Sequence, residues 1–108
     1  MKKRIVLVCL AGMTTNLLVN RMRRAADMKE KDVDIVAISA SEVEKDIQNE
    51  QTDIYLLGPQ VRYLKNDIKQ ALNNSGIPVK NIDMTDYGLM DGSKVFAYAE
   101  RLLEDISE

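Results

Sequence analysis

Short apolar runs alternate with helical periodicities along the chain. Short β-branched runs predict strands at Arg4–Val8, Val33–Ser39 and Asp53–Leu57, with a shorter one near Val79–Asp83. The runs Ile5–Val8 and Ile54–Leu57 are almost continuously apolar, which suits strands covered on both faces. The segments between and after these runs repeat apolar side chains every three or four residues, as one face of a helix does. The predicted faces consist of Leu18, Met22, Ala25 and Ala26; of Val43 and Ile47; of Val61, Leu64, Ile68 and Leu72; and of Val95, Ala99, Leu102, Leu103 and Ile106.

Boundary signals support three of these helices. Ser41-x-x-Glu44 has the form of a capping box at the start of the second helix. Asn74-Ser75-Gly76 followed by Pro78 ends the third, and Met90-Asp91-Gly92-Ser93 leads into the last. The alternation of strand and helix predicts a single α/β domain, a four-stranded parallel sheet with helices on both faces. We expect strand order 2-1-3-4, as in flavodoxin-like and phosphatase-like folds.

The composition excludes several classes of protein. The 108 residues are 45% apolar and 30% charged, with a net charge of −2 and five aromatic residues, which does not suit a nucleic-acid-binding surface. No apolar run approaches the ~20 residues that span a bilayer, so we expect a cytoplasmic protein without membrane insertion. One cysteine and no histidine exclude an internal disulfide, a Cys–His pair and a histidine metal site. We expect that the protein binds no metal and no cofactor. We also expect it to be a monomer.

The single cysteine, Cys9, directly follows the first predicted strand. After it come Leu10, Ala11, Gly12, Met13, Thr14, Thr15 and Asn16, and an amphipathic pattern begins at Leu17. In a doubly wound sheet, ligands bind beyond the carboxyl ends of the strands at the switch point, which here joins this loop to Gly58-Pro59-Gln60. N–H groups at a helix N-terminus favour negative charge, and Gly12 lets the backbone approach a ligand closely. The loop therefore predicts a phosphoryl-binding site around Cys9.

Several different roles are open to a cysteine in this position. A lone cysteine at the end of a buried strand is most often a small apolar core residue. A low-molecular-weight tyrosine phosphatase or arsenate reductase needs an arginine where this chain has Thr15, and thioredoxin chemistry needs Cys-x-x-Cys. A response regulator needs an aspartate where Leu57-Gly58 stands, and flavodoxin needs aromatic residues around its flavin. The core role and the phosphoryl-binding role therefore remain.

Three segments resemble a known family. Cys9-Leu10-Ala11-Gly12-Met13-Thr14-Thr15 resembles the Cys-x-x-Gly-x-Ser-Thr loop of the IIB components of the bacterial sugar phosphotransferase system, lactose/cellobiose (chitobiose) family. The segments 53–63, with Gly58-Pro59-Gln60, and 87–94 are similar to that family's third strand with its turn and to the approach to its last helix. Thr14 and Asn16 stand where serine is usual, and both keep a polar side chain. The resemblance covers residues 1–108 as one domain of this type.

The resemblance implies a phosphocysteine relay. Cys9 would accept a phosphoryl group from the phosphohistidine of a IIA partner and pass it to a β-linked disaccharide held by a membrane IIC partner. The backbone of Leu10–Asn16 would bind the phosphoryl group, because phosphoryl transfer needs positioning and charge stabilisation above all. The donor's imidazole would arrive with the partner, which fits a chain without histidine.

Four residues are candidates for partner docking. Arg21 and Arg24 share a helical face with Leu17 near the loop, and Tyr87 follows the fourth predicted strand. Each also has an ordinary structural role open to it, a solvated charged face for the arginines and core packing for the tyrosine. The alternative to the relay is a non-catalytic flavodoxin-like binding or regulatory module with a structural Cys9. Exposure should separate the two, because a carrier's sulfur should be accessible and surrounded by N–H groups.

Overall fold

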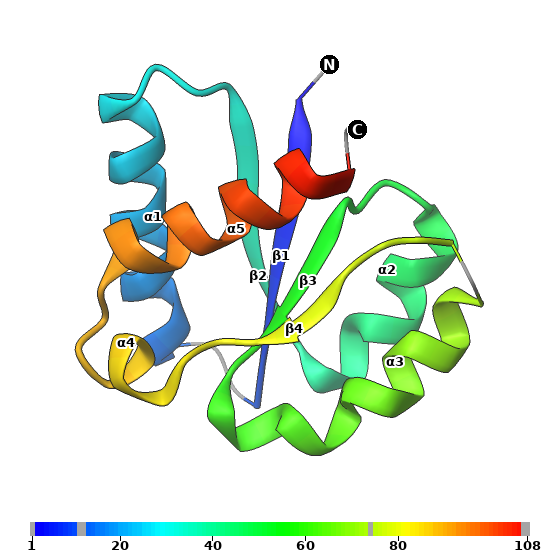
Figure 1. The fold of residues 1–108 in the computed structure, drawn as a ribbon. Coiled ribbons are helices and arrows are strands. Elements are labelled where there is room, and N and C mark those ends of the chain that lie inside the picture. The colour runs from blue at the N-terminus through cyan, green and yellow to red at the C-terminus, as the bar shows by residue number, and fades with distance from the viewer. Residues whose placement is uncertain (1, 11–12, 74, 107–108) are drawn as a thin grey trace.

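The computed structural model describes residues 2–10, 13–73 and 75–106 as one layered α/β fold (Figure 1). In chain order the elements are β1 (Lys3–Cys9), α1 (Met13–Met28), β2 (Val33–Ser39), the 3₁₀ turn η1 (Ala40–Glu42), α2 (Val43–Asn49), β3 (Ile54–Leu57), the 3₁₀ segment η2 (Pro59–Leu64), α3 (Lys65–Leu72), β4 (Val79–Asn81), α4 (Met84–Gly88) and α5 (Gly92–Ile106). The four strands are parallel in the order β2-β1-β3-β4, which confirms the predicted topology.

Alternate residues of β1 divide the core into two layers. Ile5 and Leu7 pack in a cluster with residues of α1 and α5, whereas Val6 and Val8 pack in a second cluster with residues of α2 and α3. All four side chains are fully buried, which is why β1 shows no polar alternation in the sequence. Figure 1 shows the two helix pairs on opposite sides of the sheet. The prediction of helices on both faces is confirmed.

Two predicted helix starts are wrong by a few residues. The capping box is formed by Ser39 and Glu42 and not by Ser41 and Glu44: the backbone N–H of Ser39 donates to Glu42 Oε1 at 2.9 Å. The 3₁₀ turn η1 precedes α2, so the first turn forms two residues earlier than the pattern predicts. The hydrogen bond from the Ser39 backbone lowers the pKa of Glu42 below its usual value. Helix α1 begins at Met13, before Leu17, where the amphipathic pattern starts.

One helix was not predicted at all. Helix α4 has five residues, too few to show a period, and Asp83 caps it by accepting a hydrogen bond from the backbone N–H of Asp86 at 3.1 Å. Asp83 therefore lies outside β4, which ends at Asn81 and not at Asp83 as predicted. A capping aspartate is a boundary signal that the sequence offered. The predicted strand Val79–Asp83 included this residue, so the signal was not used.

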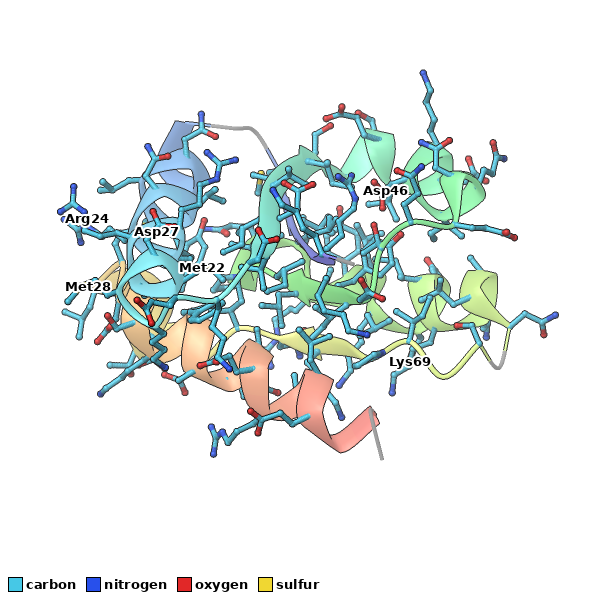
Figure 2. All side chains as sticks on the ribbon, turned by 90° about the horizontal axis from the view of Figure 1, so that it is seen from above. Met22, Arg24, Asp27, Met28, Asp46 and Lys69 are labelled. Atoms are coloured by element: carbon cyan, nitrogen blue, oxygen red, sulfur yellow. The ribbon has the colours of Figure 1, made fainter. Side chains whose placement is uncertain are left out.

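A buried polar network fixes α2 to the start of the sheet, at the end opposite Cys9. The Asp46 carboxylate accepts hydrogen bonds from Arg4 Nη2 at 2.7 Å, Thr52 Oγ1 at 2.7 Å and Tyr55 Oη at 2.6 Å. Burial acts to raise the pKa of Asp46, but these three bonds outweigh it and hold the pKa below its usual value. Burial and the bond to Asp46 raise the pKa of Tyr55. Figure 2 shows Asp46 on the inner side of α2.

Helices α1 and α5 cross at very short distance. A Cβ atom added to Gly92 would overlap the backbone carbon of Arg21 and lie 2.6 Å from the backbone nitrogen of Met22. Only glycine permits this approach without a shift of one helix. At the other end of the crossing, Lys29 Nζ lies 2.7 Å from Glu100 Oε1. No helix in the described ranges is both long and apolar enough to span a membrane.

Candidate functional site

Cys9 is the last residue of β1 and has neighbours on the two adjacent strands, β2 and β3. On one side it pairs with Ser39 of β2. On the other side Val8 pairs with Leu57 of β3, which sets Gly58 beside Cys9 at the next step of the register. The N–H of Gly58 donates to the carbonyl oxygen of Val8 at 3.0 Å. The carboxyl ends of β1 and β3 therefore lie side by side at one edge of the sheet, as the topology predicts (Figure 1).

The expectation of an accessible sulfur is wrong for this structure. Cys9 is only 3% exposed, and its Sγ donates a hydrogen bond to the carbonyl oxygen of Ile38 at 3.4 Å. The cause is the alternation along β1, because Cys9 points to the same covered face as Ile5 and Leu7. By the exposure criterion alone, the sulfur would be a structural one.

The predicted phosphoryl-binding residues divide into three groups. Leu10 forms a bend after β1 and is 56% exposed. Ala11 and Gly12 lie outside the described residues. The backbone of Met13, Thr14, Thr15 and Asn16 forms the first turn of α1. The first N–H groups of an α-helix have no partner within the helix, so this turn presents hydrogen-bond donors shortly after Cys9 in the chain.

Two side chains lie over Gly58, next to Cys9. A Cβ atom built at Gly58 would be 3.4 Å from Cε2 of Tyr87 and 3.5 Å from Oε1 of Gln60. Tyr87 belongs to α4 and is 8% exposed, so little of its surface is left for a partner, and its docking role stays a prediction. Sequence reasoning did not propose Gln60 as a site residue. The signal that could have found it was its place in the Gly58-Pro59-Gln60 turn, at the predicted switch point.

The two predicted docking arginines differ in their surroundings. Arg21 Nη1 donates to the carbonyl oxygen of Met90 at 3.1 Å, where the chain turns from α4 into α5. Arg24 makes no hydrogen bond or ion pair within the part of the chain that the structure describes. Figure 2 shows Arg24 and Met28 pointing away from the sheet, whereas Met22 points toward it. Arg21 therefore has a structural partner, and Arg24 is the freer charge.

A surface groove of about 350 Å³ lies between α1 and the turn before α5. Arg21, Arg24 and Met28 line one side of it, and Leu89 and Met90 line the other. Met28 is 81% and Leu89 66% exposed, so apolar surface borders the two cations. Leu17, 46% exposed, lies one helical turn before Arg21. The predicted docking face thus contains exposed apolar side chains as well as charge.

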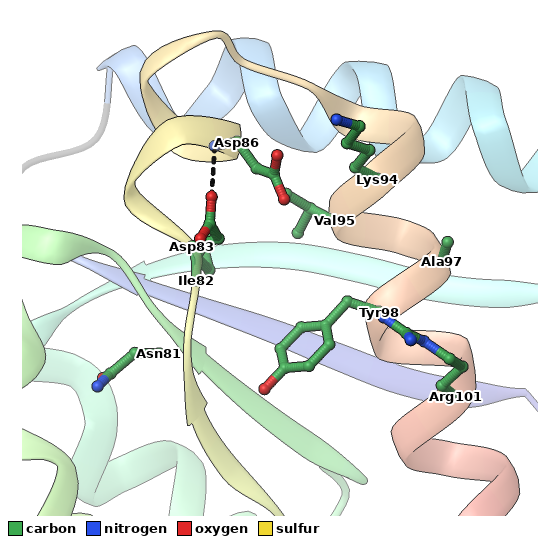
Figure 3. A pocket seen from close by; sticks show the side chains of 9 residues that line it. All are labelled: Asn81, Ile82, Asp83, Asp86, Lys94, Val95, Ala97, Tyr98 and Arg101. Carbon is green, nitrogen blue, oxygen red and sulfur yellow. Dashed lines mark hydrogen bonds between the residues drawn. The ribbon is translucent and has the colours of Figure 1, made fainter.

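A second groove, of about 510 Å³, lies between β4 and α5 (Figure 3). Asp83 and Asp86 border it on one side, and Lys94, Tyr98 and Arg101 border it on the other. None of the predicted site residues lines this groove, so we do not locate the phosphoryl chemistry there. Within the described residues, no group of three or more cysteine, aspartate or glutamate side chains is placed to hold a metal ion.

The structure thus defines a doubly wound α/β protein with a thiol at the carboxyl end of β1 and the first turn of α1 shortly after it in the chain. Comparison with known proteins identifies the family. Residues 4–98 match the family model described as "PTS system, Lactose/Cellobiose specific IIB subunit". The chain belongs to this family and is a IIB component of a sugar phosphotransferase system.

Individual relatives agree with this assignment over nearly the whole chain. The galactose-specific EIIB component of Lactococcus lactis subsp. cremoris is 40% identical over 104 residues, covering 94% of this chain and 96% of the relative. A cellobiose-specific component of L. lactis subsp. lactis is also 40% identical, with the same coverage. The oligo-beta-mannoside-specific component of Bacillus subtilis is 34% identical over 101 residues, again covering 94% and 96%.

Solved structures give the same fold. The cellobiose-specific phosphotransferase IIB component from Borrelia burgdorferi superposes with a TM-score of 0.78 at 33% identity, covering 97% of this chain and 94% of that one. The lactose-specific IIB domain from Streptococcus pneumoniae gives the same TM-score at 18% identity, covering 94% and 97%. At that identity the second likeness supports the fold alone.

Proposed function

We propose that this IIB component is a phosphocarrier that accepts a phosphoryl group on Cys9 from the phosphohistidine of a IIA partner. It then passes the group to a β-linked disaccharide, of the cellobiose, chitobiose or lactose type, during uptake through a membrane IIC partner. The observation that carries the proposal is the position of Cys9, at the switch point of a IIB fold and shortly before the first turn of α1. The relatives' names, which specify cellobiose, galactose and oligo-beta-mannoside, support a sugar without selecting one.

The chemistry needs only a nucleophile and a site for negative charge. In the first step the Cys9 sulfur attacks phosphorus, the S–P bond forms, and the N–P bond of the phosphohistidine breaks. The thiol loses its proton to solvent or to the released imidazole of the partner. In the second step a sugar hydroxyl attacks, the O–P bond forms, and the S–P bond breaks to release the Cys9 thiolate, while the hydroxyl proton passes to solvent or to this thiolate. The first-turn N–H groups of α1 hold the equatorial oxygens in both steps.

The buried thiol adds one requirement to this relay. In the structure the Cys9 thiol donates a hydrogen bond to the carbonyl oxygen of Ile38. A phosphorylated sulfur has no proton to donate, so this hydrogen bond is lost when the S–P bond forms. We therefore infer that the Cys9 side chain turns away from Ile38 as the phosphoryl group arrives.

The IIA partner must surround the carboxyl edge to bring its phosphohistidine to Cys9. Exposed Leu10 and Leu17 border this edge, and Leu89 lies across the groove from Arg24. Apolar contacts of this kind supply the buried centre of an interface, whereas a cation at the rim mainly affects encounter. We propose that Leu10 and Leu17 contact the partner and that Arg24 faces an acidic part of it.

The complete relay is tested with membranes that contain the IIC partner, a IIA partner and the general phosphotransferase proteins. The wild-type chain should restore sugar phosphorylation, and Cys9→Ser should not, because a hydroxyl is a much weaker nucleophile without a base. Circular dichroism should show the same fold for both. Sugar phosphorylation that continues with Cys9→Ser would exclude the relay and return Cys9 to a structural role.

A further inference from the structure

We propose that Gln60 is a further phosphoryl-contacting residue, whose side-chain amide donates a hydrogen bond to the phosphoryl group on Cys9. The proposal rests on the phosphocysteine function proposed above. In this proposal the turn after β3 contacts the phosphoryl group from one side, and the first turn of α1 contacts it from the opposite side.

The first argument is the register of the sheet. Cys9 points to the same face as Ile5 and Leu7, which pack against α1 and α5. On β3, Ile54 and Leu56 point to that face, and Gly58 follows them at the same alternation. Because Val8 pairs with Leu57, Cys9 and Gly58 are neighbours on one face of adjacent strands. Adjacent strands lie about 4.8 Å apart.

The second argument is the set of atoms that surrounds Gly58. No side chain extends from Gly58 beside the sulfur, and its N–H is fixed to the carbonyl oxygen of Val8 at 3.0 Å. The nearest atoms around the vacant Cβ position are Tyr87 Cε2 and the Val8 carbonyl oxygen, both at 3.4 Å, and Gln60 Oε1 at 3.5 Å. A Cys9 side chain that turns away from Ile38 of β2 turns toward β3 and Gly58 on its other side. The Gln60 amide therefore lies close to Gly58, on the side of Cys9 toward which the phosphorylated side chain would turn.

The third argument is the chemistry of the side chain. Gln60 is exposed, and its amide makes no hydrogen bond to any residue in the described ranges. A terminal amide turns easily about its last bond and offers two N–H donors to an anion. It carries no charge, so it stabilises the phosphoryl group without holding it as firmly as an arginine would. A carrier that must both accept and release the group needs this moderate affinity.

The experiment compares substitutions at Gln60 with the same substitutions at Gln70, an exposed residue of α3. Gln60→Ala removes the donor and should slow phosphorylation of Cys9 by phosphorylated IIA roughly 10- to 100-fold, the effect of one hydrogen bond to a charged group. Gln60→Glu should slow it further, because a carboxylate repels the incoming dianion. Gln70→Ala and Gln70→Glu should match the wild-type rate, and thermal unfolding should be the same for all five chains.

A direct readout separates contact from an indirect effect. The side-chain amide resonances of Gln60 should shift when wild-type Cys9 is phosphorylated, while those of Gln70 stay in place. Unshifted Gln60 resonances on a chain that has gained one phosphoryl group would overturn this proposal alone, as would a wild-type rate for Gln60→Glu. A wild-type chain that gains no phosphoryl group would overturn the phosphocysteine function and this proposal with it.

Discussion

The guanidinium of Arg21 donates a hydrogen bond to the carbonyl oxygen of Met90 at 3.1 Å, linking α1 to the turn between α4 and α5. Met90 has a positive φ of 51°, a conformation that costs energy for a residue other than glycine. A bond from Arg21 to this carbonyl helps to hold the turn. Arg21 and Arg24 are three residues apart on one helix, yet only Arg24 is available to a partner as a free charge.

Arg24→Glu is therefore the cleaner test of docking. It should slow phosphorylation by IIA, most at low ionic strength, because rim charges mainly change the rate of encounter. Its melting temperature should stay close to that of the wild type.

Arg21→Gln should lower the free energy of unfolding by about 1 kcal/mol, the usual contribution of one hydrogen bond.

Arg101→Glu, an exposed charge reversal on α5, serves as the control for net charge. Stopped-flow or quench measurements at several salt concentrations give the rates. If Arg24→Glu and Arg101→Glu transfer equally fast at low salt, Arg24 has no docking role, while the assignment of Cys9 is unaffected.

The crossing of α1 and α5 predicts a contrast between two glycines. Gly92→Ala should destabilise the fold by about 1–3 kcal/mol, because its methyl group overlaps the α1 backbone at Arg21. Gly88→Ala, also at a helical position, has no heavy atom within 4 Å of the new Cβ. It should leave stability unchanged or raise it by up to about 1 kcal/mol. Urea unfolding of both variants measures the difference, and equal midpoints would show that the crossing is looser than described.

Strand order and the two core layers could be predicted because β1 and β3 are apolar on both faces and the helices keep a 3.6-residue period. The place of Cys9 at the carboxyl edge followed from that order. The alternation along β1 places Cys9 on the same face as Ile5 and Leu7, but the sequence does not record how far this face is covered at the end of the strand, so the core role and the accessible role both stayed open. Gln60 lies in the turn that the topology placed at the switch point, but that its side chain lies over Gly58 depends on the fold of this turn, which no local pattern records.

Short elements set the remaining limit. Helix α4 is shorter than two turns, so the sequence shows only its cap at Asp83 and no period. The Arg21–Met90 hydrogen bond likewise joins residues 69 positions apart. From the sequence alone, a charged side chain on the polar face of a helix is predicted to be exposed to solvent. The sequence does not show that a turn distant in the chain packs against it.

The Asp46 network predicts a pH dependence of stability. Its folded-state pKa lies below the usual value, so in acid the unfolded chain binds more protons than the folded one. The stabilisation from Asp46 is therefore complete above the unfolded-state pKa and is lost as the pH falls through the folded-state pKa. At neutral pH, Asp46→Asn should cost about 2–4 kcal/mol, because the amide has one acceptor oxygen for three donors and no charge to pair with Arg4.

Urea unfolding of the wild type and Asp46→Asn across the acid range measures this linkage. The difference in the free energy of unfolding between the wild type and Asp46→Asn should become smaller as the pH falls. Asp27→Asn, an exposed substitution on α1, should follow the wild-type curve at every pH. A gap that stays constant down to the lowest pH would show that the network acts through packing and not through the charge of Asp46.

The hydrogen bonds of Arg23 to β2 predict that this residue protects the edge strand from pairing with another chain. Its guanidinium donates to the carbonyl oxygen of Ile35 through Nε at 3.0 Å and through Nη2 at 2.7 Å. Free backbone groups on an edge strand can pair with another chain. Arg23→Ala should therefore increase self-association in sedimentation experiments at high concentration, whereas Arg24→Ala should sediment like the wild type. A single monomeric species for Arg23→Ala would assign the protection of β2 to other groups.

The central claim is that one phosphoryl group is carried on Cys9, and intact mass spectrometry tests it most directly. The chain is incubated with phosphoenolpyruvate, the general phosphotransferase proteins and a matching IIA, and the modified residue is then located by peptide fragmentation. We predict a mass gain of one phosphoryl group, located on Cys9, and no gain for Cys9→Ser of the same fold. A wild-type chain that gains no mass, or a gain located on any residue other than Cys9, would contradict the account.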